Sequence, residues 1–397
     1  MKIAMINTSH YGSTGRIMLS VAAVAREAGH EVRTYSKLWR SNPEIEGHTY
    51  IGSKAENILH RAVAPVLSTD GCFSSGATER LIESLSEFDP DVVHLHNLHG
   101  WYLNYEKLFG YIKSSGAKVI WTLHDCWAFT GQCPHFLVSG CDRWMTGCGK
   151  CKDHKHYPEM LFDGTAKMWK RKKETFCGVE GMTLVTPSAW LSELTRRSFL
   201  SEYPVRVINN GIDLSVFSPC EENEKIKKKL GCEGKRIVLG VSFVWEYRKG
   251  LDVFIELCRR LPDDFRVVLV GVDEKLMSAL PKEIVAIGRT ESQRELSEIY
   301  SAADVFVNPT REDNFPTVNI EALASGTPVI TFDVGGAAEI IDETCGVKIP
   351  VDRVDDMERE IVRVCENRPY SVSACTERSK RYDAKERFME YRRLYEE

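Results

Sequence analysis

Short apolar runs recur along the whole chain, and each is followed by a small or polar turn and then by an amphipathic stretch. Apolar runs bounded by turns are typical of the buried strands of a parallel sheet. The repeated order of strand, turn and helix predicts the α/β fold class. The expected strands lie at residues 2–7, 31–35, 91–96, 118–123, 183–186, 236–241, 265–271, 304–309 and 329–332.

The order of strand, turn and helix begins a second time after the turn signal Asn210-Gly211. A chain of 397 residues with 43% hydrophobic residues can bury two cores. We therefore expect two Rossmann-like domains, residues 1–205 and 206–379, that face each other across a cleft. Residues 39–77 look irregular apart from helical patches around 56–66, and a short helix is expected to open at Glu339.

The first expected strand leads into a turn that carries Gly12 and Gly15, and a helix is expected over residues 17–29. A glycine turn before a helix leaves backbone N–H groups free to bind phosphate. The alternative is a tight loop with no ligand. A nicotinamide-dependent dehydrogenase would need a G-x-G-x-x-G turn here, which the spacing of Gly12 and Gly15 does not supply.

Two acids, Asp313 and Glu321, flank a turn in the second half, and a helix is expected over residues 317–325, ended by Gly326 and Pro328. Carboxylates accept pairs of sugar hydroxyls, and the N–H groups at a helix start bind a diphosphate. The pattern therefore predicts a nucleotide-sugar pocket at the carboxyl edge of a parallel sheet. The residues between the acids that we expect to line this pocket are Asn314, Phe315, Pro316, Thr317 and Val318.

A basic turn follows the expected strand at residues 236–241. Lys249 is preceded by Arg248 and followed by Gly250. A lysine at a strand-to-helix turn can approach a diphosphate and neutralise the charge of a leaving group. The alternative is a solvated Arg-Lys pair.

Three histidines, His94, His96 and His99, lie on or just after the expected strand at residues 91–96. His94 and His96 are two residues apart and therefore share one face of the strand. We expect them to pack or to contact substrate rather than to bind a metal.

Thirteen cysteines are present, and four of them, Cys133, Cys141, Cys148 and Cys151, fall within nineteen residues. Cys148 and Cys151 form a C-x-x-C pair, a spacing that lets two thiolates bind one ion. Four thiolates can make a closed structural zinc site that stabilises the polar loop over residues 126–151. The alternatives are free or disulfide-bonded cysteines and an iron–sulfur cluster. An open catalytic metal is not expected, because the pattern implies no position for water.

The formal net charge is −5, from 52 basic and 57 acidic residues, so no global field attracts nucleic acid or an anionic membrane. The first residues show no secretory signal, and no run approaches the ~20 apolar residues of a membrane span. We expect a cytoplasmic protein whose thiols are reduced or metal-bound.

One local patch is basic. Residues 167–173 combine lysines and an arginine with Met168 and Trp169, and we expect them to lie on a helix. Two interpretations stay open: peripheral contact with the inner face of an anionic membrane, or a solvated helix face.

The segment from Asp313 to Glu321 resembles the donor-site signature of glycosyltransferase family 4, whose members are retaining enzymes with the GT-B fold. In that signature two acids flank seven residues. Asp313 stands where the family usually has glutamate, and Glu312 is the alternative carboxylate. Val244 stands where the family has a diphosphate-binding arginine, and Arg248 is the candidate to replace it. The string at 210–213 also resembles the family's interdomain segment.

The run from Leu123 to Gly131, with the cysteines after it, is similar to a subset of family 4 enzymes that make bacterial surface polysaccharides of the colanic acid or capsule type. Within this run, His124 resembles the histidine that the family points at the donor sugar. The alternative for His124 is a core histidine whose ring is satisfied by Asp125.

The resemblance covers nearly the whole chain and implies transfer of a sugar from a nucleotide-diphosphate sugar to a hydroxyl of a glycan or lipid-linked acceptor, with retained configuration. It implies that Lys249, helped by Arg248, binds the diphosphate, that Asp313 and His124 hold sugar hydroxyls, and that Glu321 binds the ribose. The first domain would take the acceptor and the second the donor, and a helix within residues 380–397 would pack back on the first domain. No catalytic metal is required.

Retaining glycosidases use a dedicated carboxylate nucleophile, and the sequence shows no candidate for one. Attack by the acceptor on the same face as the leaving phosphate therefore fits better. Two alternatives to a transferase are a nucleotide-sugar epimerase of the same fold and a non-catalytic protein that binds sugar nucleotides.

Overall fold

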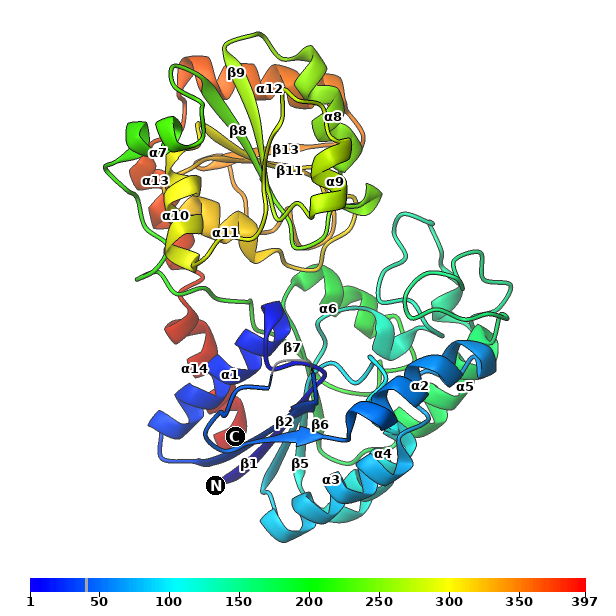
Figure 1. Cartoon of the computed structure of the whole chain (residues 1–397). Helices are drawn as coiled ribbons and strands as arrows, with labels where there is room; N and C mark the ends of the chain where they lie inside the picture. The colour runs from blue at the N-terminus through cyan, green and yellow to red at the C-terminus, as the bar shows by residue number, and fades with distance from the viewer. Residues whose placement is uncertain (40–41) are drawn as a thin grey trace. The chain divides into compact units, whose positions relative to one another are not determined.

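The computed structural model describes residues 1–39 and 42–397, which form two compact units (Figure 1). The first unit comprises Met1–Asn209 together with Arg387–Glu397, and the second comprises Asn210–Glu386. Each unit has its own parallel sheet and its own hydrophobic core.

The first unit is built on a seven-stranded sheet with the order β3-β2-β1-β4-β5-β6-β7, in which all neighbouring strands run parallel. Figure 1 shows α1 and α14 on one face of this sheet and α3 and α4 on the other. The elements are β1 (Lys2–Asn7), α1 (Gly12–Glu27), β2 (Glu31–Lys37), β3 (His48–Ile51), α2 (Lys54–Leu67), α3 (Ser75–Phe88), β4 (Val92–Leu95), α4 (Tyr105–Ser115), β5 (Lys118–Thr122), α5 (Thr165–Phe176), β6 (Met182–Thr186), α6 (Ala189–Arg196), β7 (Val205–Val207) and most of α14 (Ala384–Glu396).

The second unit is built on a six-stranded parallel sheet with the order β10-β9-β8-β11-β12-β13. Its elements are α7 (Asn223–Lys229), β8 (Arg236–Val241), α8 (Leu251–Arg260), β9 (Phe265–Val270), α9 (Glu274–Ala279), β10 (Val285–Ile287), α10 (Gln293–Ala302), β11 (Val305–Asn308), α11 (Thr317–Ala324), β12 (Val329–Phe332), β13 (Gly346–Ile349), α12 (Val354–Asn367) and α13 (Val372–Lys380).

Each sheet reverses its strand order once, between β1 and β4 in the first unit and between β8 and β11 in the second. In open parallel sheets, ligands bind outside the carboxyl ends of the strands at this reversal. The loops after β1 and β4, and those after β8 and β11, are therefore the places where the fold favours a site.

All nine expected strands are confirmed, because strands covered by helices on both faces read as continuous apolar runs. Three other expectations were wrong. Helix α1 begins at Gly12 rather than at residue 17, and the stretch expected to be irregular contains β3 and the start of α3. Residues 335–339 form turns instead of a helix opening at Glu339.

Candidate functional site

The turn after β8 and the loop after β11 meet at the carboxyl edge of the second sheet. Lys249 ends a single 3-10 turn, Tyr247–Lys249, and its Nζ forms an ion pair with the carboxylate of Asp313. The backbone N–H of Arg311 donates to the carbonyl oxygen of Arg248 at 2.8 Å. The fold thus brings together two predicted site residues from separate segments of the chain.

Gly250 allows the two segments to approach this closely. Its φ is +74°, and a Cβ at this position would lie 2.3 Å from the carbonyl oxygen of Pro309. Since any side chain would collide with that carbonyl, glycine lets α8 begin directly against the end of β11. The close approach of Gly250 to Pro309 places Lys249, the preceding residue, next to Asp313.

Arg311 is a residue that sequence reasoning missed. Its buried guanidinium donates to both carboxylate oxygens of Asp252, at 2.8 and 2.7 Å, and to Asp352 at 2.7 Å. It also donates to the carbonyl oxygen of Tyr247 at 2.6 Å and lies 3.8 Å from the centre of the Tyr247 ring. Arg311 therefore ties the 3-10 turn of Lys249 to the loop of Asp313. The only signal in the sequence is an arginine two residues before Asp313.

The two candidate carboxylates, Glu312 and Asp313, have different surroundings. Glu312 is 1% exposed, whereas Asp313 is partly exposed and contacts Lys249. Arg248 donates to the carbonyl oxygen of Glu312 at 3.2 Å and pairs with Glu246 at 2.8 Å. Arg248 is therefore close to the same loop, and Asp313 is the one of the two neighbouring acids that contacts Lys249.

Helix α11 follows this loop and begins at Thr317. Pro316 is its N-cap residue and makes no side-chain cap. The first N–H groups of a helix have no partner within the helix. Asn314 and Phe315 are buried just before it, and the amide nitrogen of Asn210 donates to the carbonyl oxygen of Phe315 at 3.3 Å. The expected helix start is confirmed, with N–H groups where an anion could bind.

Glu321 lies one turn into α11 and is almost fully buried. It accepts a hydrogen bond of 3.1 Å from the hydroxyl of Tyr300 on α10. Burial and the nearby Glu321 carboxylate raise the pKa of Tyr300 well above its ordinary value. Tyr300 is thus a protonated donor that fixes the orientation of Glu321.

Gly12 and Gly15 belong to the first turn of α1 and not to a loop before the helix. Tyr11, the N-cap residue, makes no side-chain cap. A Cβ on Gly15 would lie 2.5 Å from the carbonyl carbon of His10. Gly15 therefore lets the start of α1 pack tightly against the loop that follows β1.

His124 follows β5 at the carboxyl edge of the first sheet. Its Nε2 lies 2.9 Å from Nδ1 of His96, and the two rings are stacked. Burial lowers the pKa of His124 to about 4, so the ring is neutral at pH 7. Asp125, the alternative partner considered from the sequence, accepts from Nε2 of His99 at 2.9 Å and from the N–H of Trp127 at 2.8 Å.

His94 has a packing role, as expected. Its Nδ1 lies 2.7 Å from the hydroxyl of Tyr395 and its Nε2 lies 2.8 Å from the hydroxyl of Thr122. Both nitrogens are thus used by hydrogen bonds within the core of the first unit.

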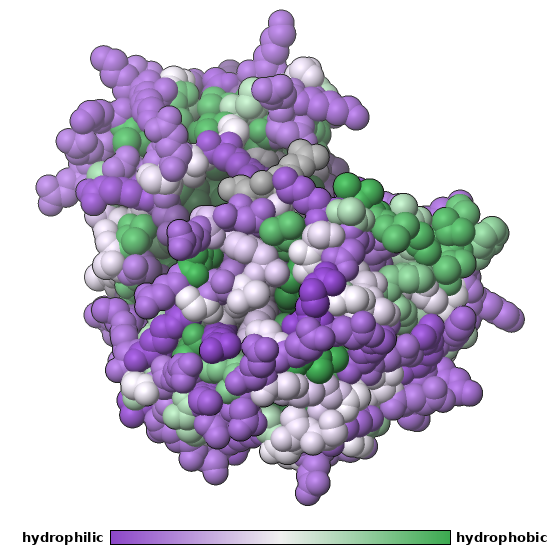
Figure 2. All heavy atoms as spheres, turned by 60° about the horizontal axis from the view of Figure 1, so that its bottom comes forward, coloured by the Kyte–Doolittle hydropathy of each residue, from purple (hydrophilic) through white to green (hydrophobic). Residues whose placement is uncertain are grey.

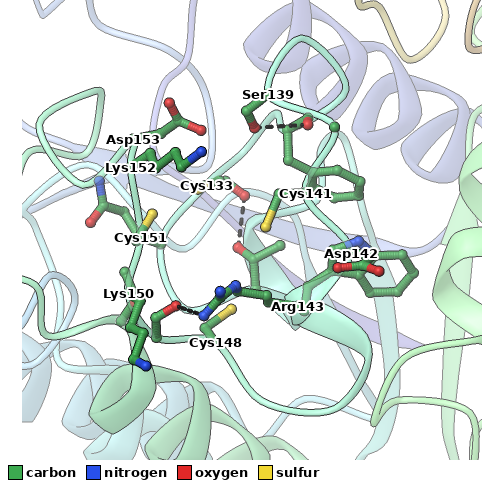
Figure 3. Close-up of a pocket in the computed structure, with 17 residues that line it drawn as sticks. Cys133, Ser139, Cys141, Asp142, Arg143, Cys148, Lys150, Cys151, Lys152 and Asp153 are labelled. Atoms are coloured by element: carbon green, nitrogen blue, oxygen red, sulfur yellow. Dashed lines mark hydrogen bonds between the residues drawn. The ribbon is translucent and has the colours of Figure 1, made fainter.

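Cys133, Cys141, Cys148 and Cys151 line one pocket of about 210 Å³ in the first unit (Figure 3). The sulfur of Cys148 accepts from the N–H of Gly131 at 3.2 Å. A hydrogen bond from the Cys133 thiol lowers the pKa of Cys151 to about 7. The four cysteines gather around one space, as the spacing predicts.

The ligand set expected for zinc is not formed in this pocket. All thirteen cysteines are free thiols, and across residues 1–39 and 42–397 no three His, Cys, Asp or Glu side chains are grouped as metal ligands. Cys133 and Cys151 hydrogen-bond to each other instead of converging with the other two sulfurs on a common centre.

The basic run at residues 167–173 lies on α5, but its apolar side chains face inward. Met168 is 1% exposed, and the indole of Trp169 donates to the carbonyl oxygen of Trp144 at 2.8 Å. Lys172 is fully buried and donates to the carbonyl oxygen of Trp127 at 2.7 Å. Of the two apolar side chains of this run, Met168 is therefore buried and Trp169 is only partly exposed. Within the described ranges, no helix is long and apolar enough to span a bilayer.

Models of two families match the chain. The model described as Glycosyltransferase Family 4 matches residues 14–216, more than half of the chain, and the model described as Glycosyl transferases group 1 matches residues 235–367.

Curated relatives include WcaC of Escherichia coli, which is named as a colanic acid biosynthesis glycosyl transferase. It is 26% identical over 272 residues, which cover 67% of this chain and 65% of WcaC. The lipopolysaccharide core biosynthesis mannosyltransferase LpsB of Rhizobium meliloti is 27% identical over 192 residues, which cover 44% of this chain and 54% of LpsB. The chain thus matches less than two thirds of the length of these relatives.

Solved structures share the fold along nearly the whole chain. Sucrose-phosphate synthase from Thermosynechococcus elongatus superposes with a TM-score of 0.75 at 18% identity, covering 100% of this chain and 98% of that one. HepE from Anabaena, solved with UDP-glucose, gives a TM-score of 0.67 at 13% identity, covering 99% of each chain. The predicted α/β class with two Rossmann-like domains of the GT-B type is confirmed.

Proposed function

Because this chain belongs to glycosyltransferase family 4, we propose that it transfers a sugar from a nucleotide-diphosphate sugar to a hydroxyl of a glycan or lipid-linked acceptor, with retained configuration. The observation that carries the proposal is the ion pair between Lys249 and Asp313 at the strand-order reversal of the second sheet. It supplies a cation for a diphosphate and a carboxylate for a sugar at one place. The names of WcaC and LpsB support a role in bacterial surface polysaccharide synthesis.

In the proposed reaction, Lys249 exchanges Asp313 for the donor's diphosphate, and Arg248 adds a second positive charge. The free N–H groups at the start of α11 bind phosphate oxygens. Asp313, released from Lys249, accepts sugar hydroxyls, and Glu321 accepts those of the ribose. For His124 in the first unit, we propose separately the contact with a sugar hydroxyl that the family resemblance implies. Phosphate-binding N–H groups at Gly12 and Gly15 are the matching proposal for the first unit.

The proposed bond changes need no enzyme nucleophile. The acceptor oxygen bonds to the anomeric carbon on the face from which the diphosphate departs, and a departing phosphate oxygen takes the acceptor proton. Lys249 and the α11 N–H groups stabilise the negative charge that develops on the diphosphate.

Lys249→Ala and Glu321→Gln test the proposal. A thermal-shift screen of nucleotide sugars, including UDP-glucose and GDP-mannose, first identifies the donor, because a bound ligand stabilises the fold. We expect transfer of radiolabelled sugar to bacterial glycan and lipid extracts to fall by about 100-fold or more in each variant, with unchanged circular dichroism. Lys282→Ala, an exposed lysine of the same unit, is the control. Wild-type transfer in both variants would contradict the assignment.

We propose zinc binding by the four cysteines as a separate, structural property, supported by their position around one pocket. Elemental analysis of fresh, chelator-free protein should find about one zinc per chain, lost in Cys148→Ser/Cys151→Ser and kept in Cys258→Ser. Less than about a tenth of this amount in the wild type would contradict zinc binding.

A further inference from the structure

Helix α2 is turned so that apolar side chains face solvent. The side chains that it buries are Asn57, His60 and Ala64, whereas Ile58, Leu59, Val66 and Leu67 are exposed. Asn57 and His60 are held inside by hydrogen bonds of 3.0 Å to the carbonyl oxygen of Leu38 and 2.8 Å to the hydroxyl of Ser74. Because these polar contacts fix the rotation of the helix, its apolar side stays outside.

The loop before α5 extends this apolar surface. The N–H of Leu161 donates to the carbonyl oxygen of Pro65 at 2.7 Å. The hydroxyl of Ser68 donates to the carbonyl oxygen of Phe162 at 2.5 Å. Leu161 and Phe162 thus lie against the C-terminal end of α2, and both side chains point outward. We call the exposed set the α2 surface; it consists of Ile58, Leu59, Val66, Leu67, Leu161 and Phe162, each between 52% and 70% exposed.

Figure 2 shows hydrophobic side chains gathered at the right-hand edge of the molecule, the side on which Figure 1 places α2 and α5. A monomeric protein rarely exposes large apolar side chains together unless they contact a partner or a membrane. We therefore infer that the α2 surface contacts a partner or a membrane.

The charges around the α2 surface are mainly basic. Lys54 and Arg61 are exposed on α2, Lys155 is exposed in the preceding part of the loop, and Lys167 and Lys170 are exposed on α5. Among the acids of these segments, Glu56 is paired with Arg80, Glu174 lies 3.8 Å from Lys170, and Asp153 lies 3.7 Å from His156. Asp163 accepts from the N–H of Cys151 at 2.8 Å. Glu159 is exposed. An apolar centre with a basic rim is the pattern that binds anionic lipid headgroups and inserts side chains between them.

We propose that the α2 surface docks the protein on an anionic lipid bilayer, with Phe162, Leu161, Ile58 and Leu59 inserted among the acyl chains and the lysines on the headgroups. The contact comes from α2 and its neighbouring loop, and α5 contributes mainly charge, since Met168 is buried and the indole N–H of Trp169 is bound to the carbonyl oxygen of Trp144. This inference does not depend on the proposed transferase reaction.

Vesicle co-sedimentation of the full chain tests the inference. The probes are vesicles of phosphatidylcholine with phosphatidylglycerol, and vesicles of phosphatidylcholine alone. We expect the wild type to bind the anionic vesicles, and Ile58→Ser/Leu59→Ser/Leu161→Ser/Phe162→Ser to bind them at least about tenfold more weakly. Met277→Ser/Val372→Ser removes two exposed apolar side chains from the second unit and should bind like the wild type. Lys155→Glu/Lys167→Glu should weaken binding and reduce its salt dependence.

Three results would overturn the inference. One is wild-type vesicle binding by the fourfold serine variant. Another is no binding of the wild type to anionic vesicles. The third is a dimer in sedimentation velocity that the serine variant abolishes, because a second copy would then be the occupant. Equal thermal midpoints of all variants, measured first, ensure that each result reports on the surface and not on the fold.

Discussion

Gly250 determines how closely Lys249 approaches the loop of Asp313. Its positive φ and its contact with the carbonyl oxygen of Pro309 leave no room for a Cβ. The position of Lys249 beside this loop depends on that close approach. Arg311, on the same loop, holds the turn of Lys249 through its hydrogen bond to the carbonyl oxygen of Tyr247. The chemistry of the site thus depends on a residue that has no functional group.

Gly250→Ala should lower both stability and transfer. A non-glycine residue at this φ costs about 1–2 kcal/mol, and the collision with Pro309 shifts Lys249. A shift of about 1 Å at a reacting group can cost about 100-fold in rate. Gly234→Ala is the matched control, because Gly234 has a φ of +66° but nothing within 4 Å of its Cβ position. Urea unfolding should report a loss for both variants, larger for Gly250→Ala because only its Cβ collides with Pro309. Only Gly250→Ala should lose transfer; equal activities would contradict this role.

The two residues of the ion pair could be proposed from the sequence, because each stands in a motif with a turn and a helix start. Arg311 could not, since nothing in the sequence separates a buried arginine with three acidic or carbonyl partners from a solvated one. Gly12 and Gly15 were placed in a loop because glycine usually marks turns. In the structure, Gly15 is needed for close packing inside the first turn of α1.

Helix α14 completes the core of the first unit. The hydroxyl of Thr122 donates its proton to the hydroxyl oxygen of Tyr391 at 3.2 Å. Since this proton is used, the Thr122 oxygen accepts from Nε2–H of His94. Nδ1 of His94 then accepts from the hydroxyl of Tyr395. The helix thus contributes both ends of a buried chain of hydrogen bonds.

Tyr395→Phe should destabilise the protein by about 1–3 kcal/mol, because it leaves Nδ1 of His94 buried without a partner. Tyr50→Phe, which removes a hydrogen bond of 2.7 Å from a partly exposed hydroxyl to the carbonyl oxygen of Pro43, is the control. It should change the free energy of unfolding by less than about 0.5 kcal/mol. Equal effects in chemical denaturation would show that the buried chain has no special role.

Elements with long apolar runs were predictable, and short polar ones were not. The four residues of β3, His-Thr-Tyr-Ile, lie at the edge of the sheet, and only Ile51 is buried. Such a strand has no apolar periodicity to detect. The inverted exposure of α2 was likewise invisible, because the sequence gives the apolar stripe but not the face that the core covers.

Both units use the same strand order, in which the first strand lies in the middle and the order reverses beside it. This shared plan places the predicted residues of each unit at the carboxyl edge of its sheet. The fold class could be read from the repeated pattern because local periodicity and topology agree. Cysteine spacing predicts which thiols line one pocket but not whether four sulfurs converge on one ion, so zinc binding stays a proposal.

Buried histidines should make the whole molecule less stable in acid. Burial lowers the pKa of His60 and His94 to about 3 and that of His124 to about 4, from an ordinary value of 6.5. The unfolded chain therefore binds more protons between these values, and stability falls as pH drops from 6.5 towards 4. Each histidine contributes up to about 1.4 kcal/mol per pH unit in this window.

Urea midpoints between pH 7.5 and pH 4.5 measure this dependence. His94→Gln should flatten the profile, and His156→Gln, at an exposed position, should leave the slope unchanged. A midpoint that stays constant down to pH 4.5 in the wild type would rule out the histidines as the cause.

The first unit is assembled from two separate stretches, Met1–Asn209 and Arg387–Glu397. During synthesis on the ribosome, every residue of the second unit emerges before the tyrosines that close the buried histidine of the first. The first unit therefore cannot complete its core until the last residues are synthesised, whereas the second unit can fold as one continuous segment. A premature stop codon shortly after residue 386 would consequently damage the amino-terminal half of the protein rather than the half in which the stop codon lies.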